Sequence, residues 1–169
     1  MSAMKMNEVV IAEFTSSQSD ILMELLMELH GPYFNSVASA DLSELSADHN
    51  SQQAFSDYVR FLDENDDDTW KAFIGFNAEK AIGFIIGSFK TDEYLVHGRI
   101  GVLEDWFVTE KWRGKGIGKQ LYAALERWFR TKECQQVISD TWPGNEISIR
   151  AHKELGFFVS GIKFSKKLL

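Results

Sequence analysis

The fold is decided by the stretch Lys111-Trp112-Arg113-Gly114-Lys115-Gly116-Ile117-Gly118-Lys119, which lies between a strand-like run and an amphipathic helix. Three glycines stand on alternate positions, and four of the nine residues are basic. Glycine lets backbone N–H groups approach an anion without an intervening Cβ, and a helix N-terminus adds partial positive charge. The stretch therefore predicts a cradle for a pyrophosphate-like anion.

The residues on either side predict the elements that frame this cradle. Residues 100–108 are rich in β-branched and aromatic side chains, which is typical of a buried strand. After the glycines, apolar side chains recur at helical spacing for more than three turns. They are Ile117, Leu121, Ala124, Leu125, Trp128 and Phe129.

Two other glycine-rich phosphate loops do not fit. A Walker A loop needs glycine at position 113 and a hydroxyl residue at position 120, where this chain has Arg113 and Gln120. A Rossmann fingerprint that starts at Gly114 needs a glycine at position 119, which is Lys119. A solvated basic turn is the simplest alternative, but three glycines at a helix start lower helix stability, so an anion site is the favoured interpretation.

The composition is that of a globular protein. With 169 residues, 44% hydrophobic and 25% charged, the chain is expected to form one domain over residues 1–169. No apolar run is long enough to cross a bilayer, and residues 1–7 lack the apolar core of a signal peptide. The single cysteine, Cys134, suits a cytoplasmic location, and the four scattered histidines predict no metal site.

The net charge of −7 argues against a nucleic-acid partner. It also makes the basic cluster around the glycines more informative, because an acidic protein has kept these side chains together. The remaining acidic surface favours a cationic substrate, although acidity also serves solubility. No membrane partner is expected.

Periodicity predicts strands over residues 8–14, 70–76, 81–89, 99–108 and 136–142, and a last strand or hairpin over residues 157–168. Helices are expected over residues 21–30, 51–62, 117–130 and 146–155, and one helical turn near residues 42–45. The order is thus β-α-α-β-β-β-α-β-α-β. This is an α/β (α+β) class with a mixed sheet and helices on both faces.

The glycine-rich stretch contains the pattern Arg-x-x-Gly-x-Gly, from Arg113 to Gly118. It closely resembles the acyl-CoA-binding signature of the GNAT superfamily of N-acetyltransferases, including the strand before it and the helix after it. The element order is similar to the GNAT fold, a mixed, mostly antiparallel sheet with a splayed central notch. The motif-level match runs from about residue 101 to residue 157. The resemblance implies one GNAT domain that uses acetyl-CoA as co-substrate and no metal.

The resemblance also implies where acetyl-CoA lies, namely between the two strands that part. The pantetheine arm would follow the backbone of Phe107 and Val108, and the Val108 N–H would face the thioester carbonyl. Asn145 would bond the pantetheine, cap the following helix, or do both. The pyrophosphate would lie on Arg113, Gly114, Lys115, Gly116, Ile117 and Gly118, with Lys115 and Lys119 adding charge.

A second run narrows the resemblance to aminoglycoside 6′-N-acetyltransferases. These carry Glu-x-Trp on the strand before the cradle, which is Glu104 and Trp106 here. On that resemblance, Glu104 and Asp140 bind the amino groups of a cationic sugar and help to take up a proton, and Asp105, Trp106 and Trp142 contact the acceptor. The run is Ser139-Asp140-Thr141, Asn145, Ser148, His152 and Leu155-Gly156-Phe157.

The residues themselves leave the base open. An amine arrives protonated, so a carboxylate must lie within reach. Strict strand alternation places Glu104, Trp106 and Val108 on one face and Asp105 on the other. Carboxylates in an apolar strand are costly to bury unless used or paired. Which of Glu104, Asp105 and Asp140 faces the site is therefore not decided.

His152 has two interpretations. Many family members have a tyrosine at this position that protonates the leaving thiolate, so His152 would be the corresponding acid. Alternatively, it is a half-buried histidine bonded to backbone or to CoA. Tyr122 is a weaker candidate for the acid.

The expected function is transfer of acetyl from acetyl-CoA to a primary amine by direct attack, with a small cationic acceptor such as an aminoglycoside or polyamine. The alternatives are acetylation of a protein N-terminus or lysine, and a non-catalytic acyl-CoA sensor. The missing tyrosine favours the sensor slightly, and Glu104 and Asp140 oppose it. Relatives often dimerise through their C-terminal strands, so a homodimer is considered.

Overall fold

The computed structural model describes residues 8–30, 52–64, 68–91 and 98–163. Its strands are β1 (Val9–Glu13), β2 (Trp70–Asn77), β3 (Lys80–Thr91), β4 (Arg99–Val108) and β5 (Gln136–Ser139). Its α-helices are α1 (Ser19–His30), α4 (Gln52–Glu64), α5 (Ile117–Thr131) and α6 (Glu146–Glu154). Short 3-10 turns, η1 (Ser16–Gln18) and η3 (Glu110–Trp112), precede α1 and the glycine-rich loop.

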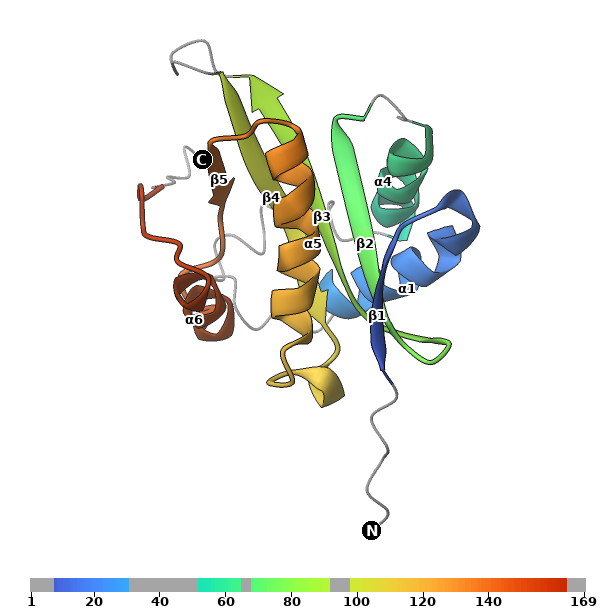
Figure 1. Ribbon diagram of the computed structural model, residues 1–169. Helices are drawn as coiled ribbons and strands as arrows, with labels where there is room; N and C mark the ends of the chain where they lie inside the picture. Colours follow the sequence, from blue (N-terminus) through green and yellow to red (C-terminus); the bar gives the residue numbers. More distant parts are fainter. Residues whose placement is uncertain (1–7, 31–51, 65–67, 92–97, 164–169) are drawn as a thin grey trace, which may run out of the picture.

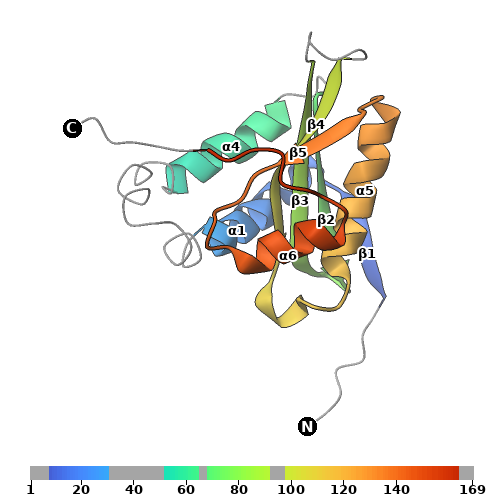
Figure 2. The same cartoon turned by 90° about the vertical axis from the view of Figure 1, so that its left-hand side faces the viewer.

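The five strands form one sheet in the order β1-β2-β3-β4-β5 (Figure 1). The first four run antiparallel to their neighbours, whereas β5 runs parallel to β4. Helices α1 and α4 cover one face of the sheet, and α5 covers the other (Figure 2). The predicted mixed, mostly antiparallel sheet with helices on both faces is confirmed.

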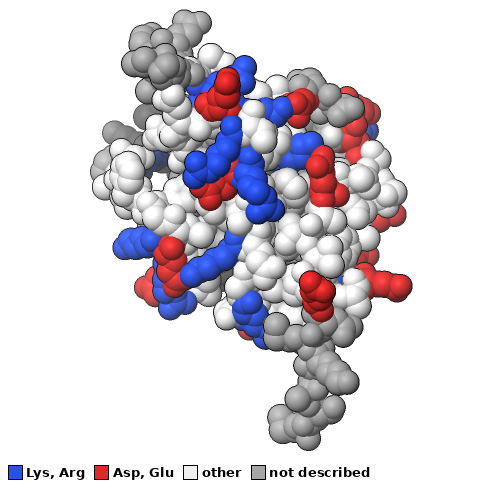
Figure 3. Space-filling model, viewed as in Figure 1, with Lys and Arg blue, Asp and Glu red and all other residues white. Residues whose placement is uncertain are grey.

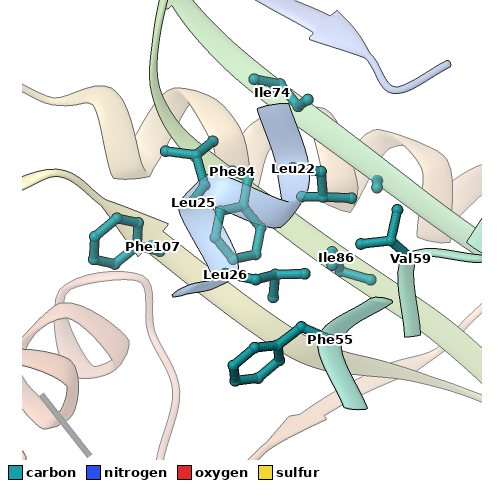
Figure 4. Close-up of a cluster of buried hydrophobic side chains, with 10 residues drawn as sticks. Leu22, Leu25, Leu26, Phe55, Val59, Ile74, Phe84, Ile86 and Phe107 are labelled. Atoms are coloured by element: carbon teal, nitrogen blue, oxygen red, sulfur yellow. The ribbon is translucent and has the colours of Figure 1, made fainter. Parts of the chain in front are cut away.

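Each face of the sheet has its own apolar core. The core on the α1 side forms because α1 carries leucines at helical spacing, and α4 adds Phe55 and Val59 (Figure 4). Full burial of one such side chain contributes roughly 1.5–3 kcal/mol. The other members of this core are Ala72, Ile74, Phe84, Ile86 and Phe107. The core on the α5 side contains Ile82, Ile85, Leu103, Trp112, Ile117, Leu121, Tyr122, Leu125, Trp128 and Phe129.

The sheet opens between β4 and β5. These strands pair only from Ile100 opposite Gln136 to Leu103 opposite Ser139. β5 is shorter than predicted, because it ends at Ser139 and leaves Asp140 beyond the strand. The two backbones therefore part after Leu103, which is the position of the expected notch.

A β-bulge interrupts β4 at the same position. Ile86 of β3 lies opposite Asp105 and Gly87 lies opposite Leu103, so Glu104 has no partner on β3. The extra residue shifts the alternation, and Trp106 packs into the α5-side core while Phe107 packs into the α1-side core. The prediction that Glu104 shares a face with Trp106 and Val108 is therefore wrong.

The predicted last strand does not form over the described residues. Phe157–Lys163 has no regular structure, and Phe158, Val159 and Ile162 are 80%, 74% and 76% exposed. Within the described ranges, no strand pairs with this segment. Residues 164–168, and the helical turn predicted near residues 42–45, lie outside the description.

Candidate active site

The glycine-rich loop leads into α5 through two left-handed residues. Gly114 has φ +74° and Gly116, the N-cap of α5, has φ +80°, a region that glycine enters without strain. A Cβ built on either residue would meet no protein atom within 4 Å, so the space over the loop is open. The first amides of α5 have no acceptor within the helix. These features fit the anion cradle that the spaced glycines predict.

Gly118 is required for a different reason. A Cβ there would lie 2.9 Å from Cζ2 of Trp106, so the helix could not approach the indole ring. The buried Nε1–H of Trp106 has no acceptor among the described residues. Trp106 thus lies beneath the loop on the α5 side, in contact with the ring of Tyr122 at a centroid distance of 6.4 Å.

The basic side chains of the loop have different surroundings. The Nε–H of Arg113 donates to the carbonyl of Val108 over 2.9 Å, and its guanidinium lies 5.8 Å from the ring centre of Phe107. Arg113 therefore ties the loop to the end of β4. Lys115 lies over the ring of Trp112, and the Nζ of Lys119 is 3.3 Å from Glu154. Figure 3 shows Lys and Arg side chains running across the face that carries α5.

Carboxylates gather on the opposite side of the sheet. Oδ1 of Asp105 lies 3.3 Å from Nε2 of His30, the last residue of α1, and the Asp105 carboxylate interacts with the hydroxyl of Tyr58 on α4. The His30 ring stacks on Phe55 with centroids 5.2 Å apart. Burial raises the pKa of Tyr58 well above its ordinary value, and the charges of Asp105 and Glu104 raise it further. Tyr58 therefore remains a donor that fixes Asp105.

Glu104 lies beside this group and is reached by solvent. The buried Ser88 hydroxyl donates to its Oε1 over 2.6 Å. Desolvation by the surrounding protein raises the pKa of the Glu104 carboxyl above its ordinary value, although the Ser88 hydrogen bond opposes the shift. The charges of Asp105 and Asp140 raise it further. A carboxyl shifted upward is better matched to accept a proton near neutral pH.

The structure does not place all the predicted acceptor residues with Glu104. Asp140 is exposed and forms a close ion pair with Lys163, although its charge reaches Glu104. Trp142 is half-buried. Trp106 lies on the other side of β4, with the α5 core. Glu104 and Asp105 are thus the pair that the bulge brings to one side.

His152 is held by three polar contacts. Its Nδ1 lies 2.8 Å from the carbonyl oxygen and 3.2 Å from the hydroxyl of Ser148, one turn earlier on α6. Its Nε2 lies 3.0 Å from Oγ of Ser139 at the end of β5. Asn145 caps α6, because its side chain accepts a 3.0 Å hydrogen bond from the Ser148 amide.

Several residues of this site were not predicted as functional. Ser88, Tyr58 and His30 come from three elements far apart in the sequence, and no local pattern connects them with β4. The spacing of Ser148 and His152 is a signal for a contact on one helix face. Within the described ranges, no cluster of three His, Cys, Asp or Glu side chains could hold a metal. In the same ranges, no helix has the length and apolarity needed to span a membrane.

Comparisons with known proteins agree with this architecture. Aminoglycoside N(6′)-acetyltransferase type 1 of Salmonella typhimurium is 40% identical over 90 residues, which are 51% of this chain and 61% of that protein. A relative of the same name from Stenotrophomonas maltophilia is 36% identical over 58 residues, 34% of this chain and 38% of that protein. The chain thus spans less than two thirds of these curated relatives.

Solved structures match over nearly the whole chain. AAC(6′)-Iy in complex with the bisubstrate analogue CoA-S-monomethyl-acetylneamine has a TM-score of 0.75 and 25% identity, covering 96% of this chain and 100% of that chain. AAC(6′)-Iy in complex with CoA gives a TM-score of 0.74 at 25% identity, covering 96% of each chain. The profile of the Acetyltransferase (GNAT) family matches residues 23–157. With a match over most of its length and the fold described above, the chain belongs to the GNAT family of acetyltransferases.

Proposed function

We propose that the protein transfers acetyl from acetyl-CoA to a primary amine of a small polycationic acceptor, with an aminoglycoside 6′-amine as the first candidate. The observation that carries the proposal is the bulge at Glu104. It places an upshifted carboxyl beside Asp105, at the point where β4 and β5 part and in the strand that leads to the anion cradle.

The cofactor side consists of the loop and the start of α5. The open space over Gly114 and Gly116 fits a pyrophosphate, and the helix N-terminus and Lys115 supply positive charge. We assign the pantetheine to the backbone of Phe107 and Val108. We assign Trp106, whose indole N–H has no acceptor in the part of the chain that the structure describes, to this side and not to the acceptor pocket.

The acceptor side is anionic. Glu104 and Asp105 lie together, and Asp140 adds charge at the margin. A polycation has several ammonium groups, so one could lose its proton to Glu104 while another pairs with Asp105. The interaction with Tyr58 and the contact with His30 orient Asp105 before the acceptor arrives.

The comparisons support this acceptor class. The relatives from Salmonella and Stenotrophomonas are named as aminoglycoside acetyltransferases, and AAC(6′)-Iy was solved with an acetylneamine analogue. The match to the Salmonella relative covers 51% of this chain. We further propose that residues 1–169 form one domain and that the protein works in the cytoplasm, where acetyl-CoA is present. A homodimer is also proposed, and the molar mass in solution tests it.

The mechanism follows from the two sides. Glu104 takes up the proton of the ammonium, directly or through water, and the free amine attacks the thioester carbonyl. Backbone N–H groups of β4 that face the notch are assigned to stabilise the oxyanion. The thiolate then leaves and needs a proton, and His152, which contacts Trp106 on the α5 side of β4, is the candidate for the acid.

The test is free-thiol release from acetyl-CoA with kanamycin, tobramycin, spermidine and short peptides with free N-termini. Kanamycin- or tobramycin-dependent release that disappears in Glu104→Gln supports the proposal. The control is Glu79→Gln, because Glu79 is an exposed residue between β2 and β3. Thiol release with the peptides but not with the other amines would show that the acceptor is a protein N-terminus and not an aminoglycoside. Acetyl-CoA binding without thiol release from any amine would point to a sensor.

A further inference from the structure

We propose that Ser139 is the residue that delivers a proton to the departing CoA thiolate, and that His152 recharges Ser139 from behind. The inference rests on the proposed acetyl transfer and names a further residue for it. Its basis is a contact between two residues: Ser139 lies where the sheet opens, and Nε2 of His152 lies 3.0 Å from Oγ of Ser139.

Ser139 occupies the last paired position of β5, opposite Leu103. The next residue of β4 is the bulged Glu104, and the next residue of β5 is Asp140, which is outside the strand. The Ser139 hydroxyl is therefore at the fork, the point where β4 and β5 part. With the pyrophosphate assigned to the loop and the pantetheine to Phe107 and Val108, the thioester end of acetyl-CoA points back along β4 toward this fork. The Ser139 hydroxyl also lies 3.5 Å from the Leu103 carbonyl, which holds it at the rim of the fork.

His152 is fixed in one tautomer by its surroundings. A backbone carbonyl can only accept, so the 2.8 Å contact between Nδ1 and the Ser148 carbonyl requires a proton on Nδ1. The ring edge also packs against Trp106 and Phe157, with centroids 5.6 Å and 5.1 Å away. The imidazole therefore cannot turn toward the fork without losing a hydrogen bond and two aromatic contacts.

Only Nε2 is left to gain or lose a proton, and its partner in the structure is Oγ of Ser139 at 3.0 Å. When the imidazole is neutral, the Ser139 hydroxyl donates to Nε2. When the imidazole is protonated, Nε2–H donates to Oγ, and the hydroxyl hydrogen turns away from His152, toward the Leu103 carbonyl at 3.5 Å or into the fork. A proton held by His152 thus reaches the fork through Ser139.

The protons balance without another reactant, because the ammonium gives up two protons on the way to the amide. The first goes to Glu104 before attack and then to solvent, and the second leaves the attacking nitrogen for solvent water as the amide forms. As the C–S bond breaks, the thiolate takes the hydroxyl proton of Ser139, and Oγ takes the proton from Nε2 of the imidazolium. His152 is left neutral with its proton on Nδ1, and one proton from water returns to Nε2 through Ser139, so that one net proton reaches solvent in each turnover.

The first test compares Ser139→Ala with Ser139→Thr. Loss of the relay is expected to lower kcat by about 10- to 100-fold, which is the lower range for a general acid, with KM for acetyl-CoA changed less than about twofold. Threonine keeps a hydroxyl and should retain most of kcat. Ser56→Ala, on the exposed side of α4, is the control. Full kcat in Ser139→Ala, or a loss confined to KM, would overturn the proposal.

A double variant separates a relay from two independent effects. If Ser139 and His152 act as one unit, Ser139→Ala combined with His152→Gln should be no slower than about the worse single variant. Multiplicative losses would contradict the relay. Mass spectrometry after incubation with acetyl-CoA alone gives a further check, because an acetyl ester on Ser139 would show a nucleophile and not a relay.

A third readout does not depend on turnover. Nitrogen NMR of histidine-labelled protein should show the Nδ1–H tautomer for His152, and Ser139→Ala should shift the Nε2 signal. CoA binding should perturb Nε2 in the wild type and much less in Ser139→Ala. An unchanged Nε2 signal would sink the inference even if acetyl transfer is established, whereas a shifted signal in a protein without transfer would leave the relay geometry intact and defeat the proposed function.

Discussion

The carboxylate of Glu104 accepts a 2.6 Å hydrogen bond from the Ser88 hydroxyl, although the Glu104 backbone itself has no partner on β3. The bulge thus takes the Glu104 backbone out of the pairing between β3 and β4, and the Glu104 side chain is bonded to β3 through Ser88. The outcome is a carboxyl that is fixed in direction yet reached by solvent. This combination suits a base, which needs both orientation and an exit for its proton.

Glu104→Gln is expected to lower kcat by about 100-fold or more, because the amide keeps the Ser88 hydrogen bond but cannot take up a proton. The same change should raise the melting temperature at neutral pH. The folded state raises the pKa of Glu104, so it binds the proton more tightly than the unfolded state does, and the ionised carboxylate destabilises the fold at pH values above the ordinary glutamate range.

The destabilising effect of the ionised Glu104 carboxylate can be checked across pH. Thermal unfolding of Glu104→Gln and wild type from about pH 4 to about pH 8 should show the advantage of the variant shrink as the pH falls and Glu104 becomes protonated in both states. Glu79→Gln serves as the matched control on the surface. A variant that melts lower than wild type at neutral pH would show that Glu104 is stabilising as a carboxylate.

Ser88→Ala tests the same carboxyl from the other partner. The Ser88 hydrogen bond lowers the pKa of Glu104, so its removal should raise that pKa and move the acid limb of the kcat/KM profile to higher pH. At a pH above the acid limbs of the wild type and of Ser88→Ala, kcat should change less than about threefold, because Glu104 is ionised in both proteins. An acid limb that stays in place, or moves to lower pH, would exclude Glu104 as the group that titrates.

Asp105→Asn tests recognition of a second ammonium. The variant should raise KM for kanamycin or tobramycin by about tenfold, because an ion pair at a partly buried site is lost. KM for a monoamine acceptor should change much less. Tyr58→Phe removes the hydroxyl that interacts with Asp105 and keeps the Asp105 charge, so it should give a smaller effect in the same direction. Equal effects on monoamines and polyamines would remove Asp105 from the acceptor site.

The local parts of this site could be predicted from the sequence, whereas the long-range parts could not. The spaced glycines before Ile117 predict the cradle, and helical spacing predicts the buried side of α5, because both depend on near neighbours. The bulge at Glu104 changes the face of every later residue on β4, and alternation alone has no signal for it. Contacts such as Tyr58 with Asp105 depend on packing between helices and sheet.

Gly116→Asp and Gly116→Asn provide a pair of nearly equal size for the cradle. Both residues enter the left-handed region more readily than other side chains, so the positive φ of +80° costs them similarly, and the protein leaves space for their Cβ. Only the aspartate adds negative charge where the pyrophosphate is assigned. Calorimetry should therefore show CoA affinity lowered by at least about tenfold more in Gly116→Asp than in Gly116→Asn.

The melting temperatures of the two Gly116 variants decide how an affinity loss is to be understood. Aspartate at the N-cap position of α5 is favourable for the helix, so Gly116→Asp should melt no lower than Gly116→Asn. A loss of CoA affinity without a loss of stability would therefore come from repulsion of the bound anion. If both variants bind CoA as the wild type does, the pyrophosphate does not lie over Gly116, and the cradle must be assigned to another part of the loop.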